Sequence, residues 1–244
     1  MKIACVIPAR YASTRLPGKP LADIAGKPMI QRVYEQVAKA THPEIVIVAT
    51  DNQRVYDVVQ SFGGTAAMTR ADHLTGTDRL AEVARAYEDI DVIINVQGDE
   101  PLIEPALIDE LASLFENESD LKMATVGAPL LESEYNEPSA VKVVCNKKGN
   151  AMYFSRSLIP YPRNAFVNGP LKHIGIYAYT REFLLTYSQM EPTAAELTES
   201  LEQLRALENG VPIRVIKTSA RFVGVDTPED LQAVNEIFAQ REKQ

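Results

Sequence analysis

The segment at residues 7–21, IPARYASTRLPGKPL, carries the basic side chains Arg10, Arg15 and Lys19 and no acidic one. It continues a strand-like apolar run at residues 2–8. An arginine guanidinium can hold two phosphate oxygens at once, and a lysine ammonium adds a compact point charge. The segment therefore predicts a cradle for a nucleoside triphosphate, with a solvated basic turn as the alternative. It is not a Walker loop, because the chain contains neither GxxxxGK[ST] nor the dinucleotide fingerprint GxGxxG.

Two further stretches, NVQGDEP at 95–101 and GVDTPED at 224–230, supply carboxylates. Asp99 follows an apolar strand-like run, and Asp226 stands directly before a Thr-Pro helix start. A strand-end carboxylate can hold Mg²⁺ through one oxygen while phosphates and waters complete the shell. Two carboxylates about 4–6 Å apart raise each other's pKa unless a divalent cation neutralises them. If Asp99 and Asp226 meet in space, the pair implies a metal; turn and helix-cap roles are the alternatives.

Other polar residues suggest a second substrate less strongly. His173 enters an apolar strand pattern, where a structural histidine is the commoner outcome. Arg156 has a surface ion pair as its plain alternative. Glu202 has Arg205 three residues further on, a spacing that suits an ion pair on a helix surface. Spacing alone therefore assigns none of these three side chains to a ligand.

Composition limits the class of protein. The chain has 244 residues, 45% of them hydrophobic and 24% charged, which predicts one globular domain over 1–244. A net charge of −8 argues against broad binding to nucleic acid or anionic lipid, so the cationic segment should serve a small partner. The start of the chain has no signal-peptide pattern and no run long enough to span a membrane, and we expect a cytoplasmic protein. Cys5 and Cys145 lie in apolar segments and are expected as reduced, packed thiols.

Apolar periodicity predicts alternating strands and helices in the first half of the chain, and then a change of rhythm. Strands are expected at 2–8, 44–50, 65–69, 91–96, 173–180 and 213–219, a hairpin at 141–157, and helices at 28–40, 52–62, 77–87, 181–190, 197–208 and from Thr227. The alternation indicates an α/β fold with an open, mixed, mostly parallel sheet flanked by helices. Ligands of such sheets bind beyond the carboxyl ends of the strands, where residues 8–19, 70–76 and 97–101 emerge.

Five segments together resemble the 3-deoxy-manno-octulosonate cytidylyltransferases, the CMP-Kdo synthetases. They are IPARYASTRLPGKPL, RADHLTGTDR, NVQGDEP, HIGIYAY and GVDTPEDL, and they follow the family's order over nearly the whole chain. The resemblance implies a nucleotidyltransferase-type single domain. It also implies that CTP and Kdo react with Mg²⁺ to give CMP-Kdo and pyrophosphate for lipopolysaccharide synthesis, without a covalent enzyme intermediate.

The resemblance also implies roles for particular residues. Arg10, Arg15 and Lys19 would hold the triphosphate; Pro8, Ala9, Thr75, Gly76 and Thr77 would line the cytidine; Asp99 and Asp226 would carry the metal; and Gln97, Arg156, His173, Tyr177 and Glu202 would bind the sugar acid. Arg10, Lys19, Asp99 and Asp226 are the expected catalytic residues. One position departs from the family pattern, because Thr75 stands where serine is usual.

The family's usual homodimer has a local candidate in the predicted hairpin at 141–157, within a sugar-binding and dimerisation region at 141–180. Its apolar residues Val141, Val143, Met152 and Phe154 need burial somewhere. The closest alternatives are cytidylyltransferases for 8-amino-Kdo or sialic acid, and enzymes acting on a sugar 1-phosphate. A nucleotide-binding regulator without catalysis is the alternative from another class.

Overall fold

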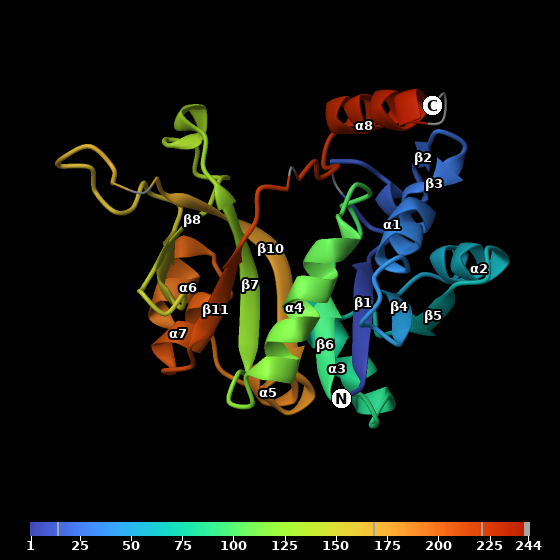
Figure 1. The fold of residues 1–244 in the computed structure, drawn as a ribbon. Helices are drawn as coiled ribbons and strands as arrows, with labels where there is room; N and C mark the ends of the chain where they lie inside the picture. Colours follow the sequence, from blue (N-terminus) through green and yellow to red (C-terminus); the bar gives the residue numbers. More distant parts are fainter. Residues whose placement is uncertain (14, 168, 221, 242–244) are drawn as a thin grey trace.

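The computed structural model describes residues 1–13, 15–167, 169–220 and 222–241. A nine-stranded sheet runs through the molecule with helices on both faces (Figure 1). Its strands are β1 (Ile3–Ala9), β4 (Ile45–Thr50), β5 (Thr65–Met68), β6 (Val92–Asn95), β7 (Met123–Pro129), β8 (Lys142–Cys145), β9 (Ala151–Ser155), β10 (Leu171–Thr180) and β11 (Ile213–Lys217). A separate two-stranded hairpin is formed by β2 (Asp23–Ile24) and β3 (Lys27–Pro28).

The main sheet is mixed, as the sequence predicts. Its strand order is β11-β7-β10-β6-β1-β4-β5. The pairs β6–β1, β1–β4, β4–β5 and β7–β11 are parallel, whereas β10 is antiparallel to both β6 and β7. The predicted hairpin is β8–β9, joined to the sheet through the pairing of β8 with β10. The α/β architecture with a mostly parallel open sheet is therefore confirmed.

The helices bury both faces of the sheet. They are α1 (Met29–Val37), α2 (Gln53–Ser61), α3 (Gly76–Ala86), α4 (Pro105–Asn117), α5 (Arg181–Tyr187), α6 (Ala194–Glu199), α7 (Leu204–Glu208) and α8 (Pro228–Arg241), with 3₁₀ turns η1 (Lys19–Leu21) and η2 (Glu132–Glu134). In β1, Ile3, Cys5 and Ile7 face the core under α1, α2 and α4, while Ala4 and Val6 face the core under α3 and α5. Strands buried on both sides are continuous apolar runs, which is why this strand was readable from the sequence.

Two parts of the element pattern differ from the prediction. The expected helix at 197–208 is two short helices, α6 and α7, because Ser200 adopts a left-handed conformation with φ 51° and ends the first of them. The residues between them form a turn that holds Glu202. The prediction also contained neither α4 nor β7, although α4 begins with Pro105 at its first turn and buries Leu107, Ile108 and Leu111.

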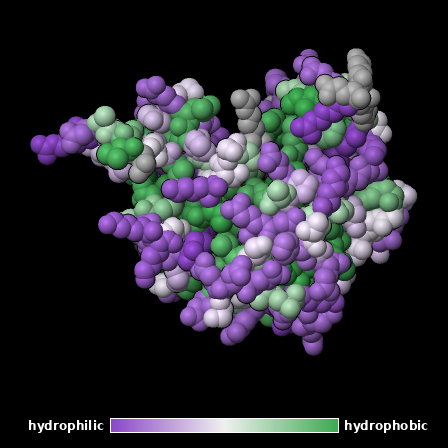
Figure 2. All heavy atoms as spheres, in the orientation of Figure 1, coloured by the Kyte–Doolittle hydropathy of each residue, from purple (hydrophilic) through white to green (hydrophobic). Residues whose placement is uncertain are grey.

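The surface in Figure 2 is largely polar, with apolar residues gathered in a few small areas. One such area lies on the segment between β9 and β10, which projects at the upper left of Figure 1. Cys5 is buried and Cys145 half-buried, and both are free thiols, as expected. Within the described ranges, no helix combines the length and the apolar character needed to cross a membrane.

Candidate active site

A cleft of about 430 Å³ opens beyond the carboxyl ends of β1 and β6. It is formed by the cationic segment after β1, the start of α3, the loop after β6 and the residue before α8. Its lining residues are Pro8, Ala9, Arg10, Ala12, Ser13, Arg15, Lys19, Pro20, Gly76, Gln97, Gly98, Asp99 and Asp226. The cleft thus joins the basic segment to both predicted metal-binding aspartates.

Lys19 lies between the two aspartates. Its Nζ is 2.5 Å from Asp99 Oδ2 and 2.8 Å from Asp226 Oδ1. Burial disfavours the ammonium, but the charge of Asp99 and hydrogen bonds to both carboxylates outweigh burial and raise the pKa of Lys19. Arg15 is more exposed and reaches Asp226 Oδ1 with Nη2 at 3.1 Å. The two carboxylates therefore share one cationic partner, a geometry in which they are close enough to share a metal ion.

The donor set fits Mg²⁺. Asp99 and Asp226 offer hard carboxylate oxygens at the mouth of a cleft lined by three basic side chains, Arg10, Arg15 and Lys19. Among the described residues, no cluster of three or more His, Cys, Asp or Glu could enclose a metal ion. Mg²⁺ is commonly held by one or two carboxylates together with substrate phosphates and waters, so a closed protein cage is not required. The aspartate pair matches that mode of binding.

Close packing of the backbone brings the two strand ends together. A Cβ atom on Gly98 would lie 2.8 Å from the carbonyl oxygen of Pro8, closer than real Cβ atoms approach. Glycine at this position therefore allows the loop carrying Asp99 to pass directly beside the end of β1. The backbone N–H of Val225 donates to the carbonyl of Asp99 at 2.9 Å, which ties the approach to Asp226 to the same loop.

Glu100, next to Asp99, is a buried carboxyl group beside the cleft that the sequence analysis did not single out. Its Oε2 is buried and has no hydrogen-bond partner among the described residues. A Cβ on Gly224 would lie 3.2 Å from Glu100 Oε1, so glycine leaves room for this carboxyl group. Burial, and then the charge of Asp99, raise the pKa of Glu100 to about 7. In the sequence, only the position of Glu100 directly after Asp99 in GDEP indicates that its carboxyl group lies near the site.

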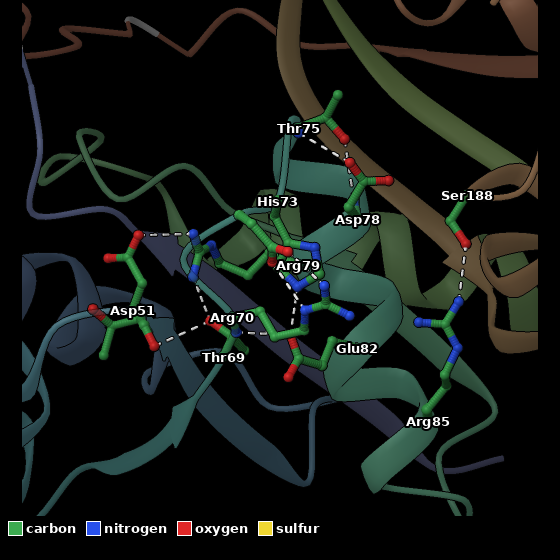
Figure 3. A network of polar contacts seen from close by, with 12 residues as sticks. Asp51, Thr69, Arg70, His73, Thr75, Asp78, Arg79, Glu82, Arg85 and Ser188 are labelled. Atoms are coloured by element: carbon green, nitrogen blue, oxygen red, sulfur yellow. Dashed lines mark hydrogen bonds and ion pairs between the residues drawn. The ribbon is translucent and has the colours of Figure 1, made fainter. Parts of the chain in front are cut away.

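Arg10 contacts the loop between β5 and α3 rather than an acid. Its Nη2 donates to the carbonyl of His73 at 2.7 Å. A network of side chains holds this loop (Figure 3). The fully buried Arg79 reaches Asp51 at 3.1 Å and also bonds Thr69, and His73 bonds Glu82. One wall of the cleft is therefore braced by buried ionic and polar contacts.

The start of α3 places the residues predicted to line cytidine. Thr75 caps the helix: its Oγ1 accepts from the N–H of Asp78 at 3.1 Å, and Asp78 Oδ2 accepts from the N–H of Thr75 at 3.0 Å. Gly76 lines the cleft, whereas Thr75 and Thr77 do not. Thr77 is buried, and its hydroxyl opposes the rise in pKa that burial causes in Glu202 and Tyr179. Thr77 therefore connects the helix start to the region of the predicted sugar residues.

The predicted sugar residues are only partly gathered around the cleft. Gln97 lines it and donates from Nε2 to the carbonyl of Gly175 at 3.2 Å. His173 and Tyr177 stand along β10 in a row of aromatic rings, with centroids 5.4 Å apart. Burial lowers the pKa of His173 to about 3, so its ring is neutral, and Nε2 lies 3.1 Å from Thr125 Oγ1.

Neither Arg156 nor Glu202 has the contacts of a simple surface ion pair, the alternative that the sequence offered for each. The Arg156 guanidinium donates to the carbonyls of Glu199, Pro138 and Ser200 at 2.7, 3.0 and 3.2 Å, and so ties β9 to the end of α6. The sequence predicts a surface ion pair between Glu202 and Arg205, and this prediction is wrong. Arg205 pairs with Glu196 instead, and its Nε donates to Glu196 Oε2 at 2.8 Å. Burial raises the pKa of Glu202.

Comparison with known proteins decides the family. Residues 4–217 match the family model described as cytidylyltransferase. A 3-deoxy-manno-octulosonate cytidylyltransferase of Geobacter metallireducens is 54% identical over 97% of this chain and 97% of its own length. One from Syntrophotalea carbinolica is 52% identical over 96% and 97%. The chain belongs to the 3-deoxy-manno-octulosonate cytidylyltransferase family.

Solved structures agree with this membership. A CMP:2-keto-3-deoxy-manno-octonic acid synthetase complexed with CTP is 50% identical, with a TM-score of 0.95 over 99% of this chain and 100% of that one. A 4-diphosphocytidyl-2C-methyl-D-erythritol synthase from Anaerococcus prevotii, 11% identical, has a TM-score of 0.66 over 98% of each chain and so shares the fold alone. The resemblance found in the sequence to the 3-deoxy-manno-octulosonate cytidylyltransferases is confirmed.

Thr75, which caps α3, gives a test of the cap. We expect Thr75→Ala to lower the free energy of unfolding by about 1 kcal/mol, because the N–H of Asp78 loses its acceptor. Thr75→Ser should stay within about 0.5 kcal/mol, since it keeps the hydroxyl. Urea denaturation measures both, with the exposed Thr198→Ala as control. Equal stability of the serine and alanine variants would contradict the capping role.

Proposed function

We propose that the protein transfers CMP from CTP to the anomeric hydroxyl of Kdo, releasing pyrophosphate and forming CMP-Kdo. The names of relatives that are more than half identical over nearly their full length support the substrates. The CTP complex of a chain with 50% identity supports the nucleotide. The observation that carries the chemistry is the cleft, which Arg10, Arg15 and Lys19 line together with an aspartate pair that shares Lys19 as its partner.

The reaction needs positioning and neutralisation of charge rather than a nucleophilic side chain. The anomeric oxygen of the sugar forms a bond to the α-phosphorus of CTP, the bond from that phosphorus to the leaving pyrophosphate breaks, and the hydroxyl proton is released. Arg10, Arg15 and Lys19 would hold the phosphate oxygens from one side of the cleft. Two unit charges at 4 Å interact with about 4 kcal/mol at an effective dielectric constant of 20, so each contact can change the rate greatly.

Asp99 and Asp226 would hold Mg²⁺ in this proposal. The ion would supply charge neutralisation at the phosphates. In the structure Lys19 lies where its ammonium neutralises the same two carboxylates. Lys19 is therefore positioned to move between the aspartates and the phosphates without leaving the cleft.

The remaining assignments follow the family resemblance. Pro8, Ala9 and the turn from Thr75 to Thr77 would line the cytidine. Gln97, Arg156, His173, Tyr177 and Glu202 would bind Kdo, with Arg156 or the metal facing its carboxylate. We place the reaction in the cytoplasm, where CTP is available, as a supply of activated sugar for lipopolysaccharide synthesis.

A substrate panel tests the proposed function. Pyrophosphate release is measured with CTP, UTP, GTP or ATP, each combined with Kdo, 8-amino-Kdo, sialic acid or a sugar 1-phosphate. We expect turnover with CTP and Kdo to exceed every other pair. Faster pyrophosphate release with 8-amino-Kdo or sialic acid would identify that sugar, and not Kdo, as the substrate. Binding of CTP without any pyrophosphate release would favour a nucleotide-binding regulator.

We also propose that the chain forms a homodimer through the β8–β9 hairpin. Val143 and Phe154 are already buried within the chain. The large apolar side chains that the hairpin exposes are Met152, 63% exposed, and Tyr153, 38% exposed. Among the described residues, β8 is the one strand that pairs with β9, so the other edge of β9 has no strand partner along its length. The segment that follows the hairpin adds the exposed Tyr161 and Val167.

Replacing Asp99 tests the aspartate pair. We expect Asp99→Asn to retain the fold and to lower kcat by about 10²–10³, because a neutral amide cannot neutralise a metal ion as a carboxylate does. Circular dichroism checks the fold, and pyrophosphate release measures the rate. Asp89→Asn is the control, since Asp89 pairs with Lys2 on the exposed surface. Turnover unchanged from the native enzyme would remove Asp99 from the mechanism.

Replacing Lys19 tests whether its ammonium and a divalent cation share one position. We expect Lys19→Met to bind Mn²⁺ alone about tenfold more tightly, because both carboxylates lose their shared partner. The same variant should have a higher KM for CTP. Electron paramagnetic resonance of free Mn²⁺ measures the affinity, and Lys27→Met, which loses a pair with Glu35, is the control. Weaker Mn²⁺ binding in the Lys19 variant would overturn this prediction.

The homodimer is tested by sedimentation at micromolar concentration. We expect the native chain to sediment as a dimer and Met152→Asp as a monomer, because a carboxylate in an apolar contact is costly to bury. Leu74→Asp, at an 89% exposed position away from the hairpin, serves as the matched control and should remain a dimer. A monomeric native chain would reject the proposal.

A further inference from the structure

The C-terminal helix α8 begins two residues after Asp226 and lies over the β2–β3 hairpin (Figure 1). That hairpin begins only four residues after Lys19. We propose that Asn235, in the middle of α8, is a positioning residue that holds Asp226 beside Asp99 and Lys19. It would do so by fixing α8 on the hairpin. The inference rests on the proposed function and adds to it a residue outside the cleft.

The carboxamide of Asn235 bonds the hairpin backbone at two points. Its Oδ1 accepts from the N–H of Ala25 at 2.8 Å, and its Nδ2 donates to the carbonyl of Asp23 at 3.1 Å. Nδ2 also donates to the carbonyl of Leu231 at 2.9 Å within α8, which fixes the orientation of the amide. Donor and acceptor are both used, so the hairpin can sit at only one position along the helix.

The turn that Asn235 holds has an unusual backbone. Ala25 has φ 49° and Gly26 has φ 78°, and a left-handed conformation at alanine is unfavourable by roughly 1–2 kcal/mol. Contacts fix Ala25 on both sides, since its N–H bonds Asn235 and its carbonyl accepts from Arg32 Nη2 at 2.6 Å. The Arg32 guanidinium also lies 4.5 Å from the ring centre of Phe238 in α8. The hairpin is thus held between α1 and α8.

This arrangement closes a loop of contacts that includes the aspartate pair. From Lys19 the chain runs through η1 into the hairpin, which is closed by the bond from the N–H of Met29 to the carbonyl of Ala22 at 2.8 Å. The side chain of Asn235 then joins the hairpin to α8. At the start of α8, the N–H of Asp226 donates to Asp230 Oδ2 at 3.0 Å, and Asp226 returns to Lys19 at 2.8 Å.

Asn235 acts at a distance from the cleft. It is nine residues from Asp226, about 13 Å along a helix. Val234 and Phe238 bury the apolar side of α8 and hold the helix to the body of the protein. Apolar contact is non-directional, whereas hydrogen bonds are directional, so the apolar side supplies attachment and Asn235 supplies the exact position along the hairpin. Loss of Asn235 should therefore alter the cleft more than it alters stability.

The experiment compares Asn235→Ala with Gln232→Ala, a matched change on the same helix, where the amide donates to the exposed Glu236. Thermal unfolding, kcat and KM with CTP and Kdo, and the affinity for Mn²⁺ without nucleotide are measured for the full chain. We expect Asn235→Ala to lower kcat and to weaken Mn²⁺ binding, each about tenfold, because Asp226 is then no longer held in place beside Asp99. KM should stay close to that of the control, and the unfolding temperature should fall by only a few degrees, as expected for two lost hydrogen bonds.

A second variant keeps the test decisive if Asn235→Ala does not fold. Asn235→Asp retains an acceptor for the N–H of Ala25 and loses the donor to Asp23, so its losses should be intermediate. Mn²⁺ affinity and kcat equal to those of Gln232→Ala would overturn the positioning role. Absence of turnover in the native enzyme would instead reject the proposed function, and the Mn²⁺ comparison would still test Asn235.

Discussion

The site depends on one shared charge interaction, in which the ammonium of Lys19 is held between Asp99 and Asp226. Two carboxylates this close repel each other and would bind a proton unless a cation compensates them. The three residues come from the ends of three separate segments: the loop after β1, the loop after β6 and the approach to α8. Much of the fold around the cleft can be understood as the means of bringing these segments to one point.

The parallel sheet does the first part of this work. Because β1 and β6 are adjacent and parallel, the loops that follow them leave the same edge of the sheet. Gly98 then allows the second loop to pass against the backbone of Pro8. Asp226 cannot be placed in this way, since it belongs to no strand of the sheet, and it depends on the Val225–Asp99 backbone bond and on α8.

How much of this was predictable depends on whether the signal is local. The strands β1 and β6 are continuous apolar runs, and the residues after them were assigned to the cleft from the sequence. The break at Ser200 was missed because helical spacing continues through it and only the left-handed backbone interrupts it. Other features depend on residues that are distant in the chain. They are the contact of Arg10 with His73, the burial of Glu100 and the effect of Thr77 on the pKa of Glu202, and no local sequence pattern predicts them.

The same reasoning explains why a chain of net charge −8 carries a purely basic segment beside its cleft. The basic groups are not left uncompensated, since Lys19 and Arg15 face carboxylates from distant segments and Arg10 faces a backbone carbonyl. Each of these partners is an oxygen, the atom that a phosphate also presents. An anionic ligand therefore replaces one set of oxygen contacts by another, so the cleft need not expose unpaired charge in either arrangement. The paired acids make a strongly basic segment compatible with an acidic protein. They also confine the attraction of the segment for anions to the cleft.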